Sequence, residues 1–321
     1  MSSNATVAEG RSLFAYSSYI MWGSILFTTN GLILGSILKH RILRSSKEYL
    51  VLAALAIADF VHACGLLIGG FYRTVLIYQG RDTEQVSSRD CLLTAHNLIW
   101  IWTPQAQDYM LLGVTLDRLF MIAMPMRYIC WETGYTKALL GGIFGCVFLV
   151  GLGGIFCSFN EPDVPTYDAI CFTSWAIGNK DYNTLRDTLQ AVALFASVGL
   201  YGLCPLFYWI HLGKVTPSVG SEYQTQQEKM RRQKRLLVTV GLCVLCTLCF
   251  DAVPKLSRVW MHSGANNDLF AFLVQFNVIM HNMNSVANLF FYTVRHRDIR
   301  AGILYFLKCK ELPPNFQTTH V

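Results

Sequence analysis

Long apolar runs separated by short polar segments dominate the hydrophobic pattern of this 321-residue chain. A membrane-crossing helix needs about 20 mostly apolar residues, because it must span about 30 Å of hydrocarbon. Seven runs reach that length: Leu13 to Leu38, Tyr49 to Tyr78, Cys91 to Met124, Lys137 to Phe159, Thr184 to His211, Leu236 to Trp260 and Leu269 to Val294. The pattern predicts an all-α membrane protein, a single-domain bundle of seven transmembrane helices over residues 1–321.

The composition and charge pattern agree with a bilayer environment. Hydrophobic residues make up 53% of the chain and charged residues 14%, and the mean hydropathy is +0.37. Basic residues gather between the first two runs, before the sixth run and in the tail 295–321, while the loop Gly264 to Asp268 has none. The positive-inside tendency places the basic segments in the cytoplasm and residues 1–12 outside. Topology thus explains the net charge of +6 without a nucleic-acid partner.

Two covalent features are predicted on the outer side. Asn4 opens an Asn-Ala-Thr sequence, the acceptor pattern for N-linked glycosylation. Cys91 opens the third run and Cys171 lies in the loop after the fourth, both on the oxidising side, so we expect a disulfide between them. Most other cysteines lie inside the runs, where small buried apolar residues are expected. We predict neither a metal site nor a cofactor.

Polar residues interrupt three runs at similar depths: Asn30 in the first, Asp59 in the second, and Asn284, Ser285, Asn288 and Tyr292 in the seventh. A carboxylate near the bilayer midplane is costly, so Asp59 is expected to face the bundle interior and to have partners there. Asn284, Asn288 and Tyr292 follow the i, i+4, i+8 spacing of one helix face. We therefore expect a polar network in the core of the bundle.

An Asp-Arg pair ends the third run. Arg118 follows Cys91 by 27 residues, and at about 1.5 Å per residue that length of helix covers about 40 Å, the full membrane thickness. Asp117 and Arg118 are therefore expected at the cytoplasmic mouth of the bundle, where charge reaches water. A helix end with a snorkelling arginine would explain the pair by itself, but the polar residues at other depths favour a functional role.

These features resemble the rhodopsin-like (class A) G-protein-coupled receptors over essentially the whole chain. The motifs that carry the resemblance are Asn30, LAIAD ending at Asp59, Cys91, DRL from Asp117 to Leu119, Pro205, Pro254 and NLFFY from Asn288 to Tyr292. The resemblance implies a plasma-membrane receptor that transduces an extracellular small-molecule or peptide signal to heterotrimeric G proteins. The first cytoplasmic loop and second run are similar to those of nematode serpentine chemoreceptors such as the SX class, so a chemosensory or neuropeptide ligand is expected.

The chain departs from the family at four motif positions, which hold Gln107, Leu119, Ala252 and Leu289. Gln107 replaces a small polar residue near Asp59, so a bound sodium ion is not expected. Cys91 lies further from Arg118 than is usual in the family, and we expect Pro104 to absorb the difference by kinking the helix. The stretch Phe270 to Tyr292 contains no lysine to bind retinal, which argues against an opsin.

The same resemblance implies a ligand site near the outer end of the bundle. The candidate contacts are Arg73, Trp100, Gln105, Lys255, Arg258, Gln275, His281 and Asn282. Trp100 stands where the amine receptors of the family carry an aspartate, so a biogenic amine is not expected. The positive charges of Arg73, Lys255 and Arg258 favour a carboxylate or an acidic peptide. The alternative is that such cations extend to the outer lipid headgroups.

The resemblance also implies a switch on the cytoplasmic side. Lys234 stands where many family members carry an acid that pairs with the arginine of span three. Asp117 is therefore expected to be the principal restraint on Arg118, while Asn288 and Tyr292 complete the switch.

The tail is expected to form a short amphipathic helix in the membrane interface. Four apolar residues share one face of the segment after Tyr292: Ile299, Ile303, Phe306 and Leu307. Cys309 follows this segment and is a candidate for palmitoylation.

Other protein classes fit less well. A transporter or channel of helical-bundle type remains the alternative, but the inverted repeats typical of many transporters are missing from the sequence. An enzyme is not predicted, because His62, His96 and His281 are scattered and neither HExxH nor GxSxG occurs.

Overall fold

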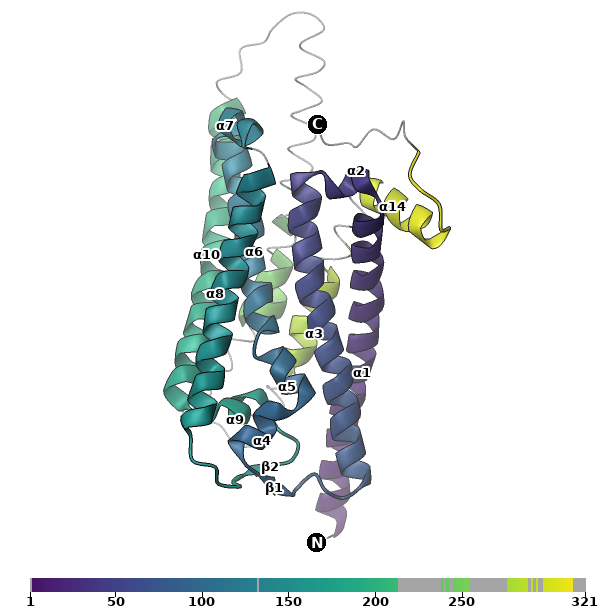
Figure 1. Cartoon of the computed structure of the whole chain (residues 1–321), viewed down its shortest axis with the longest axis vertical. Helices are drawn as coiled ribbons and strands as arrows, with labels where there is room; N and C mark the ends of the chain where they lie inside the picture. The colour runs from purple at the N-terminus through teal and green to yellow at the C-terminus, as the bar shows by residue number, and fades with distance from the viewer. Residues whose placement is uncertain are drawn as a thin grey trace, which may run out of the picture.

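The computed structural model describes residues 2–131, 133–212, 238, 241–242, 245–253, 276–287, 290, 293 and 297–313, without the side chains of residues 2–12, 125, 129, 205, 208, 209, 211 and 212. The described residues form a tall bundle of roughly parallel helices (Figure 1). Its elements are α1 Ser2–Lys39, α2 Arg41–Arg44, α3 Lys47–Tyr78, α4 Ser88–Leu93, α5 Ala95–Trp100, α6 Thr103–Ala123, α7 Pro125–Cys130, α8 Thr133–Asn160, α9 Thr173–Ile177, α10 Lys180–Leu212, the π-helical turn η1 Leu248–Ala252 and α14 Arg297–Leu307. Residues 276–287 are also helical. The all-α class predicted from the sequence is confirmed.

Four of the described helices are long and apolar enough to cross a membrane: Leu13–Lys39, Lys47–Tyr78, Thr133–Asn160 and Lys180–Cys204. They match the first, second, fourth and fifth predicted runs within a few residues. Their outer faces are apolar, and Phe71, Leu149 and Phe156 are more than half exposed. An apolar surface of this kind suits contact with lipid. The helix α1 begins at Ser2, ahead of the predicted run, so the expected outer segment 1–12 starts within a helix, and the side chain of Asn4 is outside the described residues.

The third predicted run is not one continuous helix. It is divided into α4, α5 and α6, with breaks at Thr94 and at Ile101 and Trp102. Proline lacks an N–H group and is favoured in the first turn of a helix, and Pro104 lies in the first turn of α6. Pro104 therefore does not kink a continuous helix, as we expected, but lies where a new helix begins. The straight path assumed from Cys91 to Arg118 was wrong.

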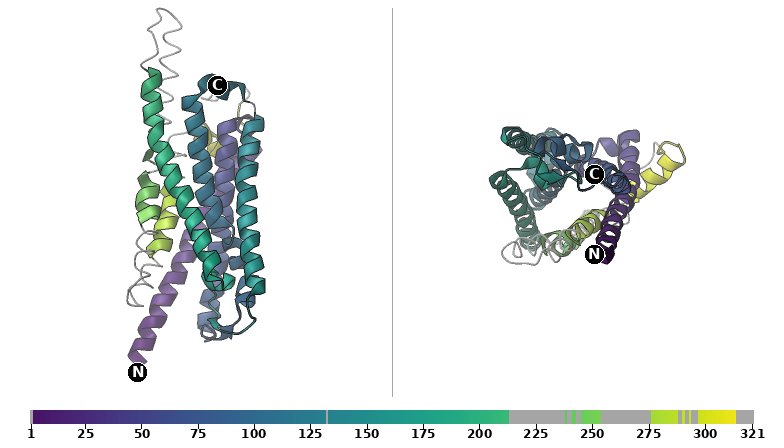
Figure 2. Two further views of the ribbon diagram at one scale, coloured as in Figure 1. Left: turned by 90° about the vertical axis from the view of Figure 1, so that its left-hand side faces the viewer. Right: turned by 90° about the horizontal axis from the view of Figure 1, so that it is seen from below.

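The helices enclose one polar interior. The helix α1 packs along α3, and α6 packs along α10. Seen along the long axis, the described parts of residues 245–253 and 276–287 lie between α10 and α1 (Figure 2). These segments bring the polar residues of the last two predicted spans toward α3 and α6.

The two ends of the bundle differ. One end carries α4, α5, α9 and a small antiparallel sheet, in which β1 Gln85–Val86 pairs with β2 Tyr167–Asp168 (Figure 1). The first residues of α1 lie at this end, which we call the β1–β2 end. The opposite end carries α2, α7 and α14, and we call it the α14 end.

The predicted tail helix is present as α14, docked against α1 and α2. Ile299 is fully buried, and the backbone of Gly302 approaches α1 so closely that an added Cβ would lie 2.5 Å from Ser36 Oγ. The hydroxyl of Tyr49 in α3 donates a hydrogen bond of 2.8 Å to Asp298 Oδ2. Leu307 is 59% exposed, so it does not take part in the contact with α1 and α2.

Candidate functional site

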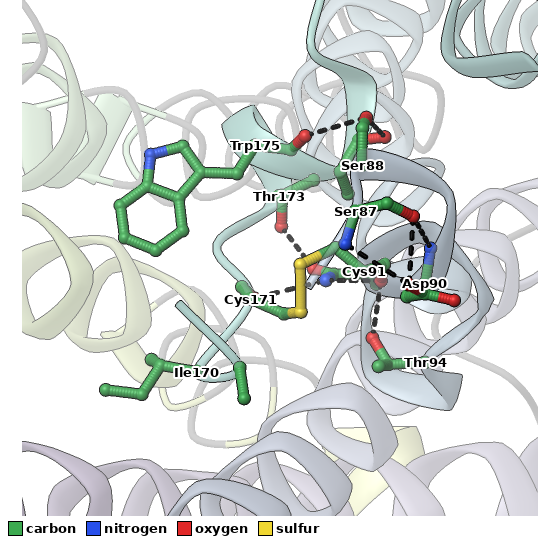
Figure 3. Close-up of a disulfide and its surroundings, with 12 residues drawn as sticks. Ser87, Ser88, Asp90, Cys91, Thr94, Ile170, Cys171, Thr173 and Trp175 are labelled. Carbon is green, nitrogen blue, oxygen red and sulfur yellow. Dashed lines mark hydrogen bonds between the residues drawn. A yellow bond between two sulfur atoms is a disulfide. The ribbon is translucent and has the colours of Figure 1, made fainter. Parts of the chain in front are cut away.

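A disulfide at the β1–β2 end fastens the loop before α9 to α4. It joins Cys91 to Cys171, as the sequence predicted, and Figure 3 shows it beside Thr94 and Thr173. The carbonyl oxygen of Cys171 accepts hydrogen bonds from Arg73 Nη2 at 2.9 Å and from the amide of Asn97 at 3.1 Å. The loop is therefore held by covalent and polar contacts together.

Arg73 of α3 is the main polar contact of this loop. Its side chain is 1% exposed, and Nε donates to the carbonyl oxygen of Ile170 at 2.9 Å. Its guanidinium carbon lies between 4.9 and 5.7 Å from the centroids of four rings, those of Tyr16, Tyr19, Trp100 and Phe172. Arg73 thus holds the loop, and it does not present the free positive charge that we expected for a ligand contact.

Replacement of Arg73 by lysine is expected to destabilise the protein. Lysine keeps the charge but loses the planar fork that reaches two loop carbonyls, and a hydrogen bond to a charged group contributes about 1.5 to 3 kcal/mol. We expect a loss of about 2 kcal/mol, measured as a lower melting temperature of the purified protein in detergent. Arg81, whose side chain is 58% exposed in an ion pair with Glu84, is the matched control. Equal melting temperatures for Arg73→Lys and Arg81→Lys would contradict the role of Arg73.

The expected ligand contacts that the structure describes lie at this end or deeper in the bundle. Trp100 packs against α3 where Gly65 leaves room, since an added Cβ there would lie 2.6 Å from Trp100 Nε1. Gln105 and Asn282 are both 1% exposed. In the part of the chain that the structure describes, neither Trp100 Nε1 nor Gln105 Oε1 has a hydrogen-bond partner. Three further expected contacts, Lys255, Arg258 and Gln275, lie outside the described residues.

A chain of polar side chains crosses the middle of the bundle. Gln107 Nε2 of α6 donates to Asp59 Oδ1 of α3 at 2.6 Å, and Ser285 Oγ lies 3.4 Å from the same carboxylate oxygen. Gln107 Oε1 lies 3.0 Å from His281 Nε2, and His281 Nδ1 lies 2.9 Å from Asp251 Oδ1 of η1. We call these five residues the Asp59 cluster. They join α3, α6, η1 and the helix at 276–287.

A second polar contact lies beside the Asp59 cluster. Thr247 Oγ1 donates to Asn284 Oδ1 at 3.1 Å, so the segments of the sixth and seventh runs are bonded a second time. A cavity of about 30 Å³ lies beside these groups and is also lined by Asp108. The buried amide of Asn30 instead donates to the carbonyl oxygen of Leu26 in its own helix. Asn288 and Tyr292 lie outside the described residues.

Arg118 at the α14 end is enclosed by carboxylates. Its Nη1 lies 3.3 Å from Glu48 Oε1 of α3, and its Nε lies 3.8 Å from Asp117 Oδ2. Tyr128 Oη of α7 donates to Asp117 Oδ1 at 3.0 Å. Burial and the neighbouring Asp117 carboxylate raise the pKa of Tyr128, so the phenol keeps its proton at neutral pH. We call Arg118, Asp117, Glu48 and Tyr128 the Arg118 cluster.

Sequence reasoning missed three residues that the structure places in these clusters. Glu48 was overlooked, although it is the only acid in the basic stretch 39–50. Asp251 was not selected, although an ionisable residue inside an apolar run marks a candidate functional site by itself. Tyr128 gave no signal, because its contact with Asp117 depends on the turn into α7. The expected counterpart Lys234 lies outside the described residues.

The sequence is similar to a family of membrane receptors and to two individual receptors. Residues 29–292 match the sequence model of the family described as "7 transmembrane receptor (rhodopsin family)". The chain is 26% identical to adenosine receptor A2b from Gallus gallus over 294 residues, which cover 84% of this chain and 81% of that protein. It is 25% identical to adenosine receptor A2b from Homo sapiens over 219 residues, which cover 61% and 63% of the two chains.

Proposed function

This chain belongs to the rhodopsin family of seven-transmembrane receptors, and on this premise we propose that it couples a ligand bound near the β1–β2 end to a G protein at the α14 end. Members of this family are receptors rather than enzymes, and their partners are an extracellular ligand and a heterotrimeric G protein. The chain is accordingly a multi-pass membrane receptor.

The Arg118 cluster is the observation that carries this proposal. Arg118 is 8% exposed and Asp117 is fully buried, so the guanidinium is withheld from solvent by carboxylates of α3 and α6. An ion pair between two helices is a two-state element, because a small separation of the helices breaks it. In the open state the same guanidinium is available to a protein partner. A G-protein helix is the partner that the family implies.

The proposed orientation puts the α14 end in the cytoplasm. Lys39, Arg41, Arg44 and Arg300 all belong to elements at that end, and basic flanks favour the cytoplasmic side. The disulfide lies at the other end, and disulfides persist in oxidising compartments. Asn4, also near the β1–β2 end, is then outside and remains a proposed glycosylation site. Cys309 follows α14 and is exposed, as acylation of its thiol requires.

The ligand remains, in our proposal, a chemosensory molecule or a neuropeptide. With Arg73 engaged by the loop, Lys255 and Arg258 are the cations proposed to attract a carboxylate or an acidic peptide. A nucleoside is a second candidate, favoured by the similarity to two adenosine receptors. Trp100 Nε1 and Gln105 Oε1, which have no hydrogen-bond partner among the described residues, offer one donor and one acceptor to an uncharged heterocycle.

The ligand classes are separated by nucleotide exchange on purified G proteins with the receptor in lipid vesicles. A carboxylate or acidic-peptide agonist is expected to lose about tenfold in potency on Lys255→Gln, equivalent to about 1.4 kcal/mol. The potency of adenosine should not depend on that charge, so adenosine serves as the internal control. Unchanged potency of an acidic agonist on Lys255→Gln would remove the charge argument. A receptor that activates no G protein with either ligand class would contradict the proposed function.

A further inference from the structure

The amide of Gln107 has a defined orientation in the Asp59 cluster. The atom that faces Asp59 lies 2.6 Å from Oδ1 and 3.4 Å from Ser285 Oγ. A carboxylate oxygen at such a distance requires a donor, because two acceptor oxygens would repel one another. The amide nitrogen of Gln107 therefore faces Asp59, and its oxygen faces His281.

This orientation determines where His281 carries its protons. Gln107 Oε1 only accepts hydrogen bonds, so His281 Nε2 at 3.0 Å is a donor. On the other side of the ring, Nδ1 lies 2.9 Å from Asp251 Oδ1. That contact is a hydrogen bond only if one more proton lies between the two atoms, on the ring or on the carboxyl group. In both forms the pair holds one proton more than a neutral imidazole beside a carboxylate.

We propose that the Asp251–His281 pair is a proton-binding site in the receptor core, and that the bound proton holds η1 against the helix at 276–287. Asp251 is 1% exposed, and the His281 side chain is 15% exposed. When the proton leaves, an imidazole lone pair faces a carboxylate at the same short distance inside the bundle. Two acceptor atoms at that distance repel one another, so the contact then opens.

The neighbouring ionisable groups favour a bound proton at this place. Asp59 of α3 and Asp108 of α6 line the same cavity as His281, and Asp251 comes from η1. His62 of α3 is the other imidazole nearby, with ring centroids 5.6 Å apart, and its Nδ1 already contacts Thr103 Oγ1 at 3.1 Å. The surplus of carboxylates compensates a positive charge on His281, so in our proposal the extra proton is on the imidazole ring rather than on the Asp251 carboxyl group.

The sign of the effect on signalling follows from the position of Asp251. It lies in a π-helical turn, a local distortion that occurs often at functional sites. With the proton bound, the sixth and seventh segments are joined and the resting state is favoured. As pH rises and the proton leaves, the sixth segment is released and basal signalling increases. This last step rests on the proposed receptor function.

The signalling test compares basal nucleotide exchange across pH in vesicles with the same buffer on both sides. The wild-type exchange rate is expected to rise about fivefold between about pH 6 and about pH 8.5, following the titration curve of a single group. Asp251→Asn should give a flat profile in the same assay, because its amide nitrogen donates to Nδ1 without titrating. His62→Gln, the matched control, should keep the wild-type slope. A wild-type profile as flat as that of Asp251→Asn would overturn the coupling. If His62→Gln loses the pH dependence, the proton is bound by His62 rather than by His281, and the proposed site is wrong.

A second measurement is independent of G proteins. Nitrogen resonances of ¹⁵N-histidine in the purified receptor should show one titrating pair of signals that disappears in His281→Gln. In Asp251→Asn the pair should remain in the neutral form over the whole range. If His281 stays neutral at every pH in the wild type, the proton site is wrong. If the receptor activates no G protein in any variant, the proposed function fails while these resonances still decide the proton site.

Discussion

Arg118→Ala is expected to abolish G-protein activation while the receptor still reaches the cell surface. In the structure Arg118 is the cation that Asp117 and Glu48 enclose at the α14 end, and in the active state its guanidinium is proposed to bind the G protein. Alanine removes the guanidinium, so the ion pairs with Asp117 and Glu48 and the proposed contact with the G protein are lost together. We therefore expect basal and stimulated exchange to fall by at least about a hundredfold, equivalent to about 2.8 kcal/mol.

Folding must be separated from signalling in this experiment. Alanine leaves two carboxylates without their cation, which is costly for buried groups. Arg118→Lys keeps a positive charge beside Asp117 and Glu48 but lacks the planar fork. It should restore surface expression without restoring more than a small part of the exchange rate. Normal signalling by Arg118→Ala, normalised to surface receptor, would reduce Arg118 to an ordinary helix end.

Glu48→Gln is expected to raise basal exchange about fivefold, equivalent to about 1 kcal/mol. Glutamine keeps the size of the side chain but removes the charge that lies 3.3 Å from Arg118 Nη1. This Glu48 side chain is 14% exposed, so solvent screens the ion pair less than at the surface. Asp117→Asn should also raise the basal rate, and the double variant should exceed both. Basal rates are measured without agonist and divided by surface receptor in the same cells.

Glu84→Gln is the matched control, because the Glu84 side chain is 49% exposed in an ion pair at the opposite end of the bundle. If it raises the basal rate as much as Glu48→Gln does, the effect is a general loss of negative charge. An unchanged rate in Glu48→Gln would leave Asp117 as the principal restraint, as the sequence suggested. Lys234→Glu, which adds an acid at the expected position of span six, remains predicted to lower the basal rate.

The helices could be predicted from the sequence because each depends on its own residues. Apolar runs such as Tyr49 to Tyr78 define the length and environment of a helix without reference to the rest of the chain. The break before α6 could not be placed in this way, since Ile101 and Trp102 continue the apolar stretch that begins at Leu98. Pro104 indicated an irregularity, but the sequence does not show whether a proline kinks a continuous helix or lies in the first turn of a new one.

The candidate site was predictable only in part, because its contacts join residues that are distant in the chain. Asp59 and Ser285 stood out as polar residues in apolar runs, and the structure brings them together across 226 positions. The pairing of Asp251 with His281 depends on the register between two helices, which spacing along one helix does not reveal. Arg73 was identified as important for its charge, yet the surrounding rings and loop carbonyls give it another role.

The hydrogen bond from Tyr49 to Asp298 connects the tail helix to the Arg118 cluster. Tyr49 follows Glu48 directly, and consecutive side chains on a helix point about 100° apart. One of the two therefore holds α14 while the other holds Arg118, both from the first turn of α3. A displacement of α14 that carries Asp298 with it applies a torque to that turn and moves the Glu48 carboxylate relative to the guanidinium. We propose that α14 rests on the membrane interface, which thereby becomes an input to the receptor's resting activity, alongside the ligand.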